Sequence, residues 1–277
     1  MPLIRQEFDY LRQLVREKSA IVLDEGKEYL VEMRLMSLAR VEGFDSVDEL
    51  ARQLRGRPYG PLHAQVIDAM TTNETSFFRD LHPFETMKGE LLPAAIKRNE
   101  VSRALTIWCA ACSSGQEPYS LAMLLHDNFP QLRSGWKINL LAGDLSHEML
   151  KRARLGLFSQ LEINRGLPAT LLVKYFTRDG AAWQVKDEIR NLIQFHELNL
   201  AQVWPNLPPV DFLFLRNVLI YFDLETKRQI LKKARAVLAP EGVLFLGGAE
   251  TTLNLDEAWE RVQSGKTVYY RIRQEGR

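Results

Sequence analysis

The residues best placed to do chemistry are Arg216, Asn217 and Tyr221, which follow a strongly apolar run of the chain. That run, Asp-Phe-Leu-Phe-Leu at 211–215, is typical of a central parallel strand that is buried on both faces. Open α/β sheets bind their ligands beyond the carboxyl ends of the strands. A guanidinium, an amide and a phenol at that point therefore predict a polar binding site.

A second group of polar residues follows two further predicted strands. The strand at 105–111 leads into Ser-Ser-Gly-Gln-Glu-Pro-Tyr at 113–119, a turn where a ligand could approach the backbone. The strand at 137–144 ends in Asp144, whose carboxylate could accept hydrogen bonds from a ribose diol. Together they fit an adenine-nucleoside ligand, and a tight turn beside a solvated carboxylate fits equally well. The turn lacks the three glycines of Gly-x-Gly-x-x-Gly, so a dinucleotide is poorly supported.

Two other features have both a structural and a functional interpretation. Glu117 precedes Pro118 at a helix start, where it either complements the helix dipole or pairs with a ligand's ammonium group. Residues 71–79 read Thr-Thr-Asn-Glu-Thr-Ser-Phe-Phe-Arg. They are either a capped helix start with a buried Phe pair or a clamp over the strand ends, in which Arg79 binds a carboxylate.

The two cysteines, Cys109 and Cys112, have the spacing of a redox dithiol or of half a zinc site. No second Cys pair or His pair in the sequence completes a metal site. We therefore interpret both as small, buried residues at the end of a strand, and we expect no metal.

The elements that must position these residues fall into a helical part and an alternating part. Residues 1–90 have helical periodicity and no strand pattern, and residues 91–103 are polar enough for a linker. From residue 104 to 277 strands alternate with helices, which implies a parallel sheet with right-handed crossovers. Residues 158–192 fit that alternation poorly and predict an inserted subdomain.

The composition excludes several classes of protein. Of the 277 residues, 46% are hydrophobic and 26% are charged, as expected for a soluble globular protein with a sizeable core. The formal net charge of +1 gives no reason to expect binding to nucleic acid or to an anionic membrane. Charges at the N-terminus argue against a signal peptide, and no apolar window is long enough to span a bilayer. We expect a cytoplasmic protein.

The order of these motifs resembles that of the CheR-type chemoreceptor methyltransferases, over nearly the whole chain. The resemblance implies an α/β, Rossmann-like methyltransferase sheet with an all-helical N-terminal domain and an inserted β-subdomain at about 158–192. It implies transfer of a methyl group from S-adenosylmethionine to receptor glutamates, which gives glutamate methyl esters for sensory adaptation and S-adenosylhomocysteine. The shared patterns are Thr-x-x-Thr-x-Phe-Phe-Arg at 72–79, Gly-x-Glu-Pro-Tyr-Ser at 115–120, Ala-Gly-Asp at 142–144, Asn199-Leu200, and Arg-Asn-Val-x-Ile-Tyr-Phe at 216–222.

The resemblance also assigns roles to individual residues. Asp144 would hold the ribose, Glu117 the methionine ammonium group, and Arg79 either the methionine carboxylate or the substrate's side of approach. The catalytic residues would be Arg79, Asn217 and Tyr221, with Asn217 and Tyr221 forming a wall around the methyl group. The cofactor contacts would be Asn73, Thr75, Arg79, Glu117, Asp144, Asn199, Leu200, Arg216 and Asn217.

Family members that grip a receptor's C-terminal pentapeptide have a longer, glycine-rich loop where this chain has Thr-Arg-Asp-Gly-Ala-Ala-Trp at 177–183. We therefore expect no pentapeptide tether, and a monomer. Residues 247–250, Gly-Gly-Ala-Glu, also depart from the family's frequent Gly-His-Ser-Glu. The helical domain would dock the receptor's acidic helices and cap the cofactor, although a solvated basic face fits equally well. Its candidate basic residues are Lys27, Arg34, Arg40, Arg52 and Arg55.

Two other functions fit the same sheet. A nicotinamide oxidoreductase would use similar strand ends, but the missing three-glycine turn argues against it. A non-catalytic sensor would keep the pocket and bind a partner or a nucleotide. The presence of Arg216, Asn217 and Tyr221 favours an active enzyme.

Overall fold

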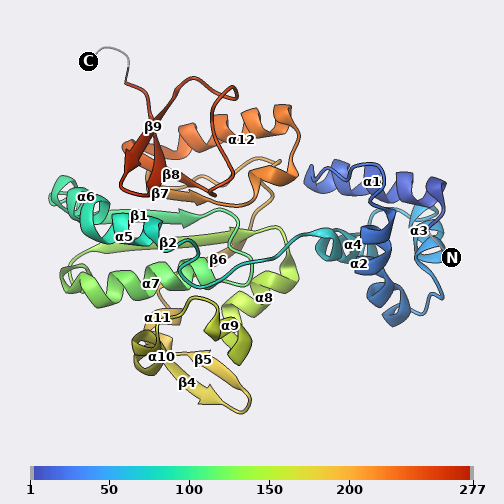
Figure 1. The fold of residues 1–277 in the computed structure, drawn as a ribbon, viewed down its shortest axis with the longest axis horizontal. Coiled ribbons are helices and arrows are strands. Elements are labelled where there is room, and N and C mark those ends of the chain that lie inside the picture. The colour runs from blue at the N-terminus through green and yellow to red at the C-terminus, as the bar shows by residue number, and fades with distance from the viewer. Residues whose placement is uncertain (1–2, 275–277) are drawn as a thin grey trace. The chain divides into compact units, whose positions relative to one another are not determined.

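The structure is a computed structural model that describes residues 3–274, and the chain forms two compact units (Figure 1). The first unit holds the residues up to Thr72 together with 221–226. The second unit holds 73–220 and the residues from Lys227 onward. Each unit has its own buried interior.

The first unit is helical, and its described residues 3–72 contain no strand, as the sequence predicted. Phe8, Leu11, Val31 and Leu35 are fully buried. Residues three or four apart share one helix face, so this spacing gives each helix an apolar stripe that packs inward. The helices are α1 (Arg5–Ser19), α2 (Glu28–Val41), α3 (Val47–Arg55) and α4 (Pro61–Met70).

The segment that follows Thr72 is also largely helical but packs in the second unit. Phe84, Met87 and Leu91 are buried in the same hydrophobic core as the strands. The units therefore divide at residue 72, whereas the change of sequence pattern placed the boundary near residue 90. The helices of this segment are α5 (His82–Thr86), the π-helix η1 (Met87–Leu91) and α6 (Leu92–Arg98).

The second unit is built around a seven-stranded sheet with the order β6-β2-β1-β7-β8-β10-β9 (Figure 1). The strands from β6 to β8 run parallel, and β10 is antiparallel to both β8 and β9. The predicted α/β class is confirmed, although β9 was not predicted from the sequence pattern. The strands are β1 (Ala104–Cys109), β2 (Lys137–Asp144), β6 (Ile193–Glu197), β7 (Val210–Leu215), β8 (Leu238–Leu246), β9 (Trp259–Ser264) and β10 (Thr267–Ile272).

Every residue of β7 is buried, as the apolar run predicted. Its acid, Asp211, joins the amino ends of the central strands: it accepts hydrogen bonds from Arg98, Asn99 and the Thr106 amide. These bonds satisfy a carboxylate that would otherwise be costly to bury. The remaining helices beside the sheet are α7 (Gln116–Asn128), η2 (Pro130–Arg133), α8 (His147–Leu155), η3 (Leu219–Tyr221) and α12 (Leu224–Val237).

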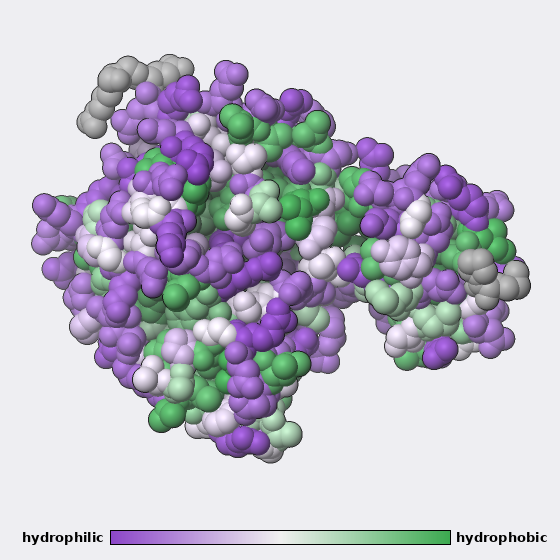
Figure 2. Space-filling view, viewed as in Figure 1, coloured by the Kyte–Doolittle hydropathy of each residue, from purple (hydrophilic) through white to green (hydrophobic). Residues whose placement is uncertain are grey.

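Between α8 and β6 the chain forms a small sheet with the order β3-β5-β4 and three short helices. Strands β4 and β5 are joined by a tight turn at Gly180 and Ala181, where Gly180 has a φ of 57°. Leu161 and Val173 of the insert are exposed to solvent. Figure 2 shows apolar side chains at the surface of the lower part of the view, where Figure 1 places the insert. Its elements are β3 (Leu157–Ser159), α9 (Gln160–Asn164), α10 (Ala169–Tyr175), β4 (Phe176–Asp179), β5 (Ala182–Val185) and α11 (Asp187–Arg190).

Cys109 is the last residue of β1, and Cys112 follows it into the turn before α7. Both are free thiols and both are buried. Burial raises the pKa of each thiol well above its usual value, so both are neutral at physiological pH. They are the small buried residues that the sequence indicated.

Candidate functional site

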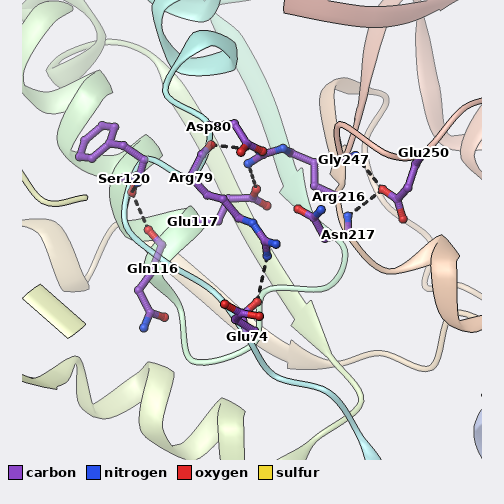
Figure 3. A network of polar contacts seen from close by, with 11 residues as sticks. Glu74, Arg79, Asp80, Gln116, Glu117, Ser120, Arg216, Asn217, Gly247 and Glu250 are labelled. Carbon is purple, nitrogen blue, oxygen red and sulfur yellow. Dashed lines mark hydrogen bonds and ion pairs between the residues drawn. The ribbon is translucent and has the colours of Figure 1, made fainter. Parts of the chain in front are cut away.

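Arg216 lies directly after β7, and its side chain is only 2% exposed. Its guanidinium donates to Glu117 Oε2 at 2.8 Å and to Asp80 Oδ2 at 2.7 Å (Figure 3). It also donates to the carbonyl oxygen of Arg79 at 2.9 Å. One buried cation therefore joins β7, the start of α7 and the loop before α5.

A buried cation is stable only when it is paired and its hydrogens are bonded. Arg216 has two carboxylate partners, but its Nε is buried and has no hydrogen-bond partner among the described residues. Buried donors are usually hydrogen-bonded, so this Nε is available to a water molecule or a ligand atom. The site therefore keeps a hydrogen-bonding group that the protein alone does not use.

Glu117 occupies the first turn of α7, where the helix dipole favours a carboxylate. The turn before it depends on Gly115, which has a φ of 97° and closely approaches α8. A Cβ at Gly115 would lie 3.1 Å from the Cβ of Ala153. The single glycine of the turn thus allows the helix start to lie against the strand ends.

Asp144 ends β2, and its carboxylate is held by backbone amides. Oδ2 accepts from the Ser113 amide at 2.7 Å, and Oδ1 accepts from the Ser146 amide at 2.9 Å. Asp144 is 8% exposed, so the alternative of a solvated carboxylate is wrong. The carboxylate fixes the β1–α7 turn, and a carboxylate can accept more than two hydrogen bonds.

The segment from Asn73 to Arg79 is an extended loop that hydrogen bonds hold to α7 and the turn before it. Ser113 Oγ donates to the Asn73 carbonyl at 2.9 Å, and the Phe78 amide donates to Ser120 Oγ at 2.9 Å. Arg79 donates to the carbonyl of Glu74 at 3.0 Å (Figure 3). These bonds place the loop against α7 and the turn after β1, and the binding of a carboxylate by Arg79 stays a prediction.

Several residues around the site have left-handed backbone angles although they are not glycine. They lie in the loop before α5, in the turn after β1 and directly after β7. Backbone strain of this kind costs on the order of 1–3 kcal/mol per residue and clusters at active sites and ligand clamps. The residues are Phe78 (φ 46°), Asp80 (65°), Leu81 (44°), Ser113 (49°) and Asn217 (58°).

Asn217 is fixed by Glu250, a residue to which the sequence assigned no role. The amides of Asn217 and Gly247 both donate to Glu250 Oε2, at 2.7 Å and 2.6 Å (Figure 3). A Cβ at Gly247 would lie 2.5 Å from Asn217 Nδ2, so a larger residue there would force the Asn217 side chain to move. The segment at 247–250 therefore supports the site even though it departs from the family's frequent Gly-His-Ser-Glu.

The other predicted site residues lie in different places. Asn199 and Leu200 follow β6, which pairs with β2 so that Glu197 lies opposite Asp144. Tyr221 belongs to the first unit, where its carbonyl accepts the amide of Val22. The structure therefore groups the predicted residues other than Tyr221 in the second unit.

Sequence reasoning missed Asp80 and Glu250 as site residues. Asp80 directly follows Arg79 in a polar loop, and its bond to Arg216 spans 136 residues of sequence. A contact between residues so far apart leaves no local periodicity to detect. The only local signal was the presence of an acid next to a predicted site arginine.

The second unit has the groups that an adenine-nucleoside sulfonium cofactor requires. Asp144 provides a carboxylate for a diol, and Glu117 and Arg216 provide charges for an amino-acid portion. The turn at Gly115 leaves backbone exposed at a helix start. The site thus fits such a group.

Among residues 3–274 there is no cluster of three or more potential metal ligands, and none of the described helices is both long and apolar enough to cross a membrane.

Two family models match the chain. "CheR methyltransferase, all-alpha domain" covers residues 6–71, and "CheR methyltransferase, SAM binding domain" covers residues 73–268. The boundary between the two matches coincides with the division between the two compact units at residue 72.

Curated proteins match over almost their full length. The chain is 42% identical to "Chemotaxis protein methyltransferase 1" of Pseudomonas aeruginosa, over 96% of this chain and 98% of that protein. It is 40% identical to "Chemotaxis protein methyltransferase Cher2" of Pseudomonas putida with the same coverage. It is 35% identical to "Chemotaxis protein methyltransferase 1" of Vibrio cholerae, over 97% of each chain.

Proposed function

Because the chain belongs to the CheR methyltransferase family, we propose that it transfers a methyl group from S-adenosylmethionine to glutamate side chains of chemoreceptors. The observation that carries the proposal is the 42% identity to a chemotaxis protein methyltransferase over 96% of the chain. The products are glutamate methyl esters and S-adenosylhomocysteine, and the esters serve sensory adaptation.

The bound cofactor supplies an electrophilic methyl group on a sulfonium sulfur. A receptor glutamate forms the new carbon–oxygen bond as the carbon–sulfur bond breaks. Glutamate has a pKa near 4.3, so the nucleophile is already ionised at neutral pH and needs no general base. The protein's task is to align the carboxylate with the methyl group and to exclude water.

We assign the cofactor contacts as the family pattern does. Asp144 binds the ribose hydroxyls. Glu117 binds the methionine ammonium group, with Arg216 fixing the carboxylate of Glu117 by their 2.8 Å bond. Arg79 lies beside this pair, because its carbonyl accepts from Arg216 and its guanidinium is held by Glu74. The remaining contacts are Asn73, Thr75, Asn199, Leu200 and Asn217.

The family pattern makes Arg79, Asn217 and Tyr221 the catalytic residues, and the first two belong to the second unit. Arg79 binds a carboxylate, either that of the methionine portion or that of the substrate. Asn217 lines the region of the methyl group, and the role of Tyr221, which belongs to the first unit, stays a prediction. The left-handed backbone of Asn217 and its bond to Glu250 support a fixed position for that amide.

The helical unit docks the receptor through basic side chains, but three of the candidates already have hydrogen-bond partners within the unit. Arg55 is bonded to the buried carboxylate of Glu7, and Arg34 donates to the carbonyls of Met70 and Thr71. Arg52 donates its Nε to the Asp48 carbonyl but stays exposed. The candidates with an exposed charge for docking are therefore Arg40 and Arg52, whereas Lys27 is half-buried.

We predict that Arg52→Glu raises the receptor KM several-fold, because one exposed ion pair contributes about 0.2–1 kcal/mol and its reversal adds repulsion. Methylation rates over a range of receptor concentrations measure this effect. The matched control is Arg228→Glu, an exposed residue of α12. Both variants keep the wild-type affinity for S-adenosylhomocysteine. A wild-type receptor KM in Arg52→Glu would mean that the basic face is only solvated and does not dock the receptor.

The enzyme needs no C-terminal pentapeptide on its receptor, because the β4–β5 hairpin ends in a tight turn at Gly180 and Ala181. It works as a cytoplasmic monomer without nucleic acid.

The test is transfer of labelled methyl to receptor-containing membranes, followed by alkaline release of methanol. We expect base-labile label, in equal yield from receptors with and without the pentapeptide. Label that resists alkali would exclude an ester product. If methylation depends on the pentapeptide, the proposal that the enzyme needs no tether is wrong, but the methyl transfer itself is unaffected.

A further inference from the structure

A cleft of about 410 Å³ opens beside Arg216 within the second unit. It lies between the ends of β7 and β8 and the hairpin formed by β9 and β10. We call it the hairpin cleft. The charged residues Asp80, Arg216, Glu250, Arg261 and Lys266 line it. None of the family-derived cofactor assignments except Arg216 lies in its wall.

The carboxylates of the hairpin cleft already have partners. Asp80 is bonded to Arg216, and Glu250 accepts the amides of Asn217 and Gly247. Two cations of the hairpin differ from them: Arg261 and Lys266 are exposed, and neither forms an ion pair with any residue in the described range 3–274. The cleft therefore has positive charge that is not neutralised within the protein.

Arg261 and Lys266 belong to the β9–β10 hairpin, which hydrogen bonds hold in place. Ser264 Oγ donates to Glu90 at 2.6 Å, and Thr86 Oγ1 donates to Thr267 Oγ1 at 2.8 Å. These bonds tie both strands of the hairpin to α5 and η1. The turn between the strands is short, with Gly265 at a φ of 54°. Arg261 and Lys266 are thus held at one edge of the cleft, which lowers the entropy cost of binding a ligand there.

We propose that the hairpin cleft binds carboxylate side chains that flank the acceptor glutamate on the receptor helix. This inference rests on the proposed function, which makes the substrate an anionic side chain on a helix. Residues three or four positions from the acceptor lie on the same helix face, about 5–6 Å apart, so a second carboxylate can enter next to the first. Arg216 joins the cleft to Glu117, so the cleft adjoins the proposed methionine end of the site. Complementary charge of this kind governs specificity and the rate of association.

The test is charge reversal of both cations in the full-length enzyme, Arg261→Glu with Lys266→Glu. We expect the receptor KM to rise about ten-fold, because two exposed ion pairs are replaced by repulsion. We expect kcat with saturating receptor and the affinity for S-adenosylhomocysteine to stay unchanged. The rise in KM should shrink at high salt, since the pairs are exposed. The neutral double variant, Arg261→Gln with Lys266→Gln, should show a smaller rise in receptor KM. It provides a second measurement in case the charge-reversed protein does not fold.

The matched control is Arg228→Glu with Lys232→Glu, which makes the same change in net charge on exposed positions of α12. An unchanged receptor KM in the hairpin variants would overturn the inference, and so would an equal rise in the control. Loss of S-adenosylhomocysteine binding would overturn it by assigning the cleft to the cofactor. If the hairpin variants lose only inhibition by inorganic phosphate, the cleft is a small-anion site and the inference fails. Failure of the wild-type enzyme to methylate any receptor would instead refute the proposed function itself.

Discussion

Arg216→Met is expected to lower the free energy of unfolding of the second unit by about 3–5 kcal/mol, because it leaves a buried carboxylate without its cation. The Glu117 side chain is 11% exposed and loses its 2.8 Å bond, while the loop at Asp80 loses its anchor. For the same reason the Kd for S-adenosylhomocysteine should rise about 30-fold or more. Urea unfolding and calorimetry measure the two effects.

The control for this prediction is Arg228→Met, an exposed position at which the same change should alter stability by no more than about 0.5 kcal/mol. A double-mutant cycle isolates the pair. If Arg216 and Glu117 act together, Glu117→Gln should be less harmful in the Arg216→Met background than in the wild-type protein. Additive effects would mean that the ion pair contributes nothing of its own, and an unchanged cofactor affinity in Arg216→Met would remove Arg216 from the site.

Asp144→Asn has the second largest expected effect. The carboxylate accepts the amides of Ser113 and Ser146, and an Asn side chain can accept only one of them while its NH₂ group faces the other. A hydrogen bond to a charged group contributes about 1.5–3 kcal/mol, so losing one such bond and the proposed ribose contact should weaken cofactor binding about 100-fold.

Calorimetry with S-adenosylhomocysteine measures the loss, and the thermal midpoint shows whether the variant is folded. Asp179→Asn, at the exposed end of β4, is the matched control and should bind normally. A folded Asp144→Asn protein with wild-type affinity would show that Asp144 only fixes the turn and does not hold the cofactor.

The sequence predicted the parts of the fold that depend on local pattern. The apolar run of β7 and the acid that ends β2 have their expected positions. Hydrophobic periodicity and strand length depend on residues that are neighbours in sequence, so they can be predicted from it. The boundary between the units was harder to predict: the segment at 82–98 is helical by pattern, yet its apolar side chains are buried with the strands. Which core a helix joins depends on tertiary packing.

The site could be predicted only where its residues lie at the ends of predicted strands or at the start of a predicted helix. Arg216, Glu117 and Asp144 follow predicted strands or start a helix, so the topology brought them together. Asp80 and Glu250 could not be found this way, because each acts through a contact with a residue distant in sequence. The partners of Arg55 and Arg34 were missed for the same reason, and these partners change which basic residues are available to a receptor.

The central claim is that the carboxyl ends of β1, β2 and β7 form a pocket for a sulfonium nucleoside. Isothermal calorimetry of the purified full-length protein tests it most directly, with S-adenosylhomocysteine, S-adenosylmethionine and NAD as separate ligands. We predict saturable one-to-one binding of the first two, weakened in Arg216→Met and Asp144→Asn, and no heat with NAD. Absence of binding by both S-adenosyl compounds, or full binding by both variants, would contradict it.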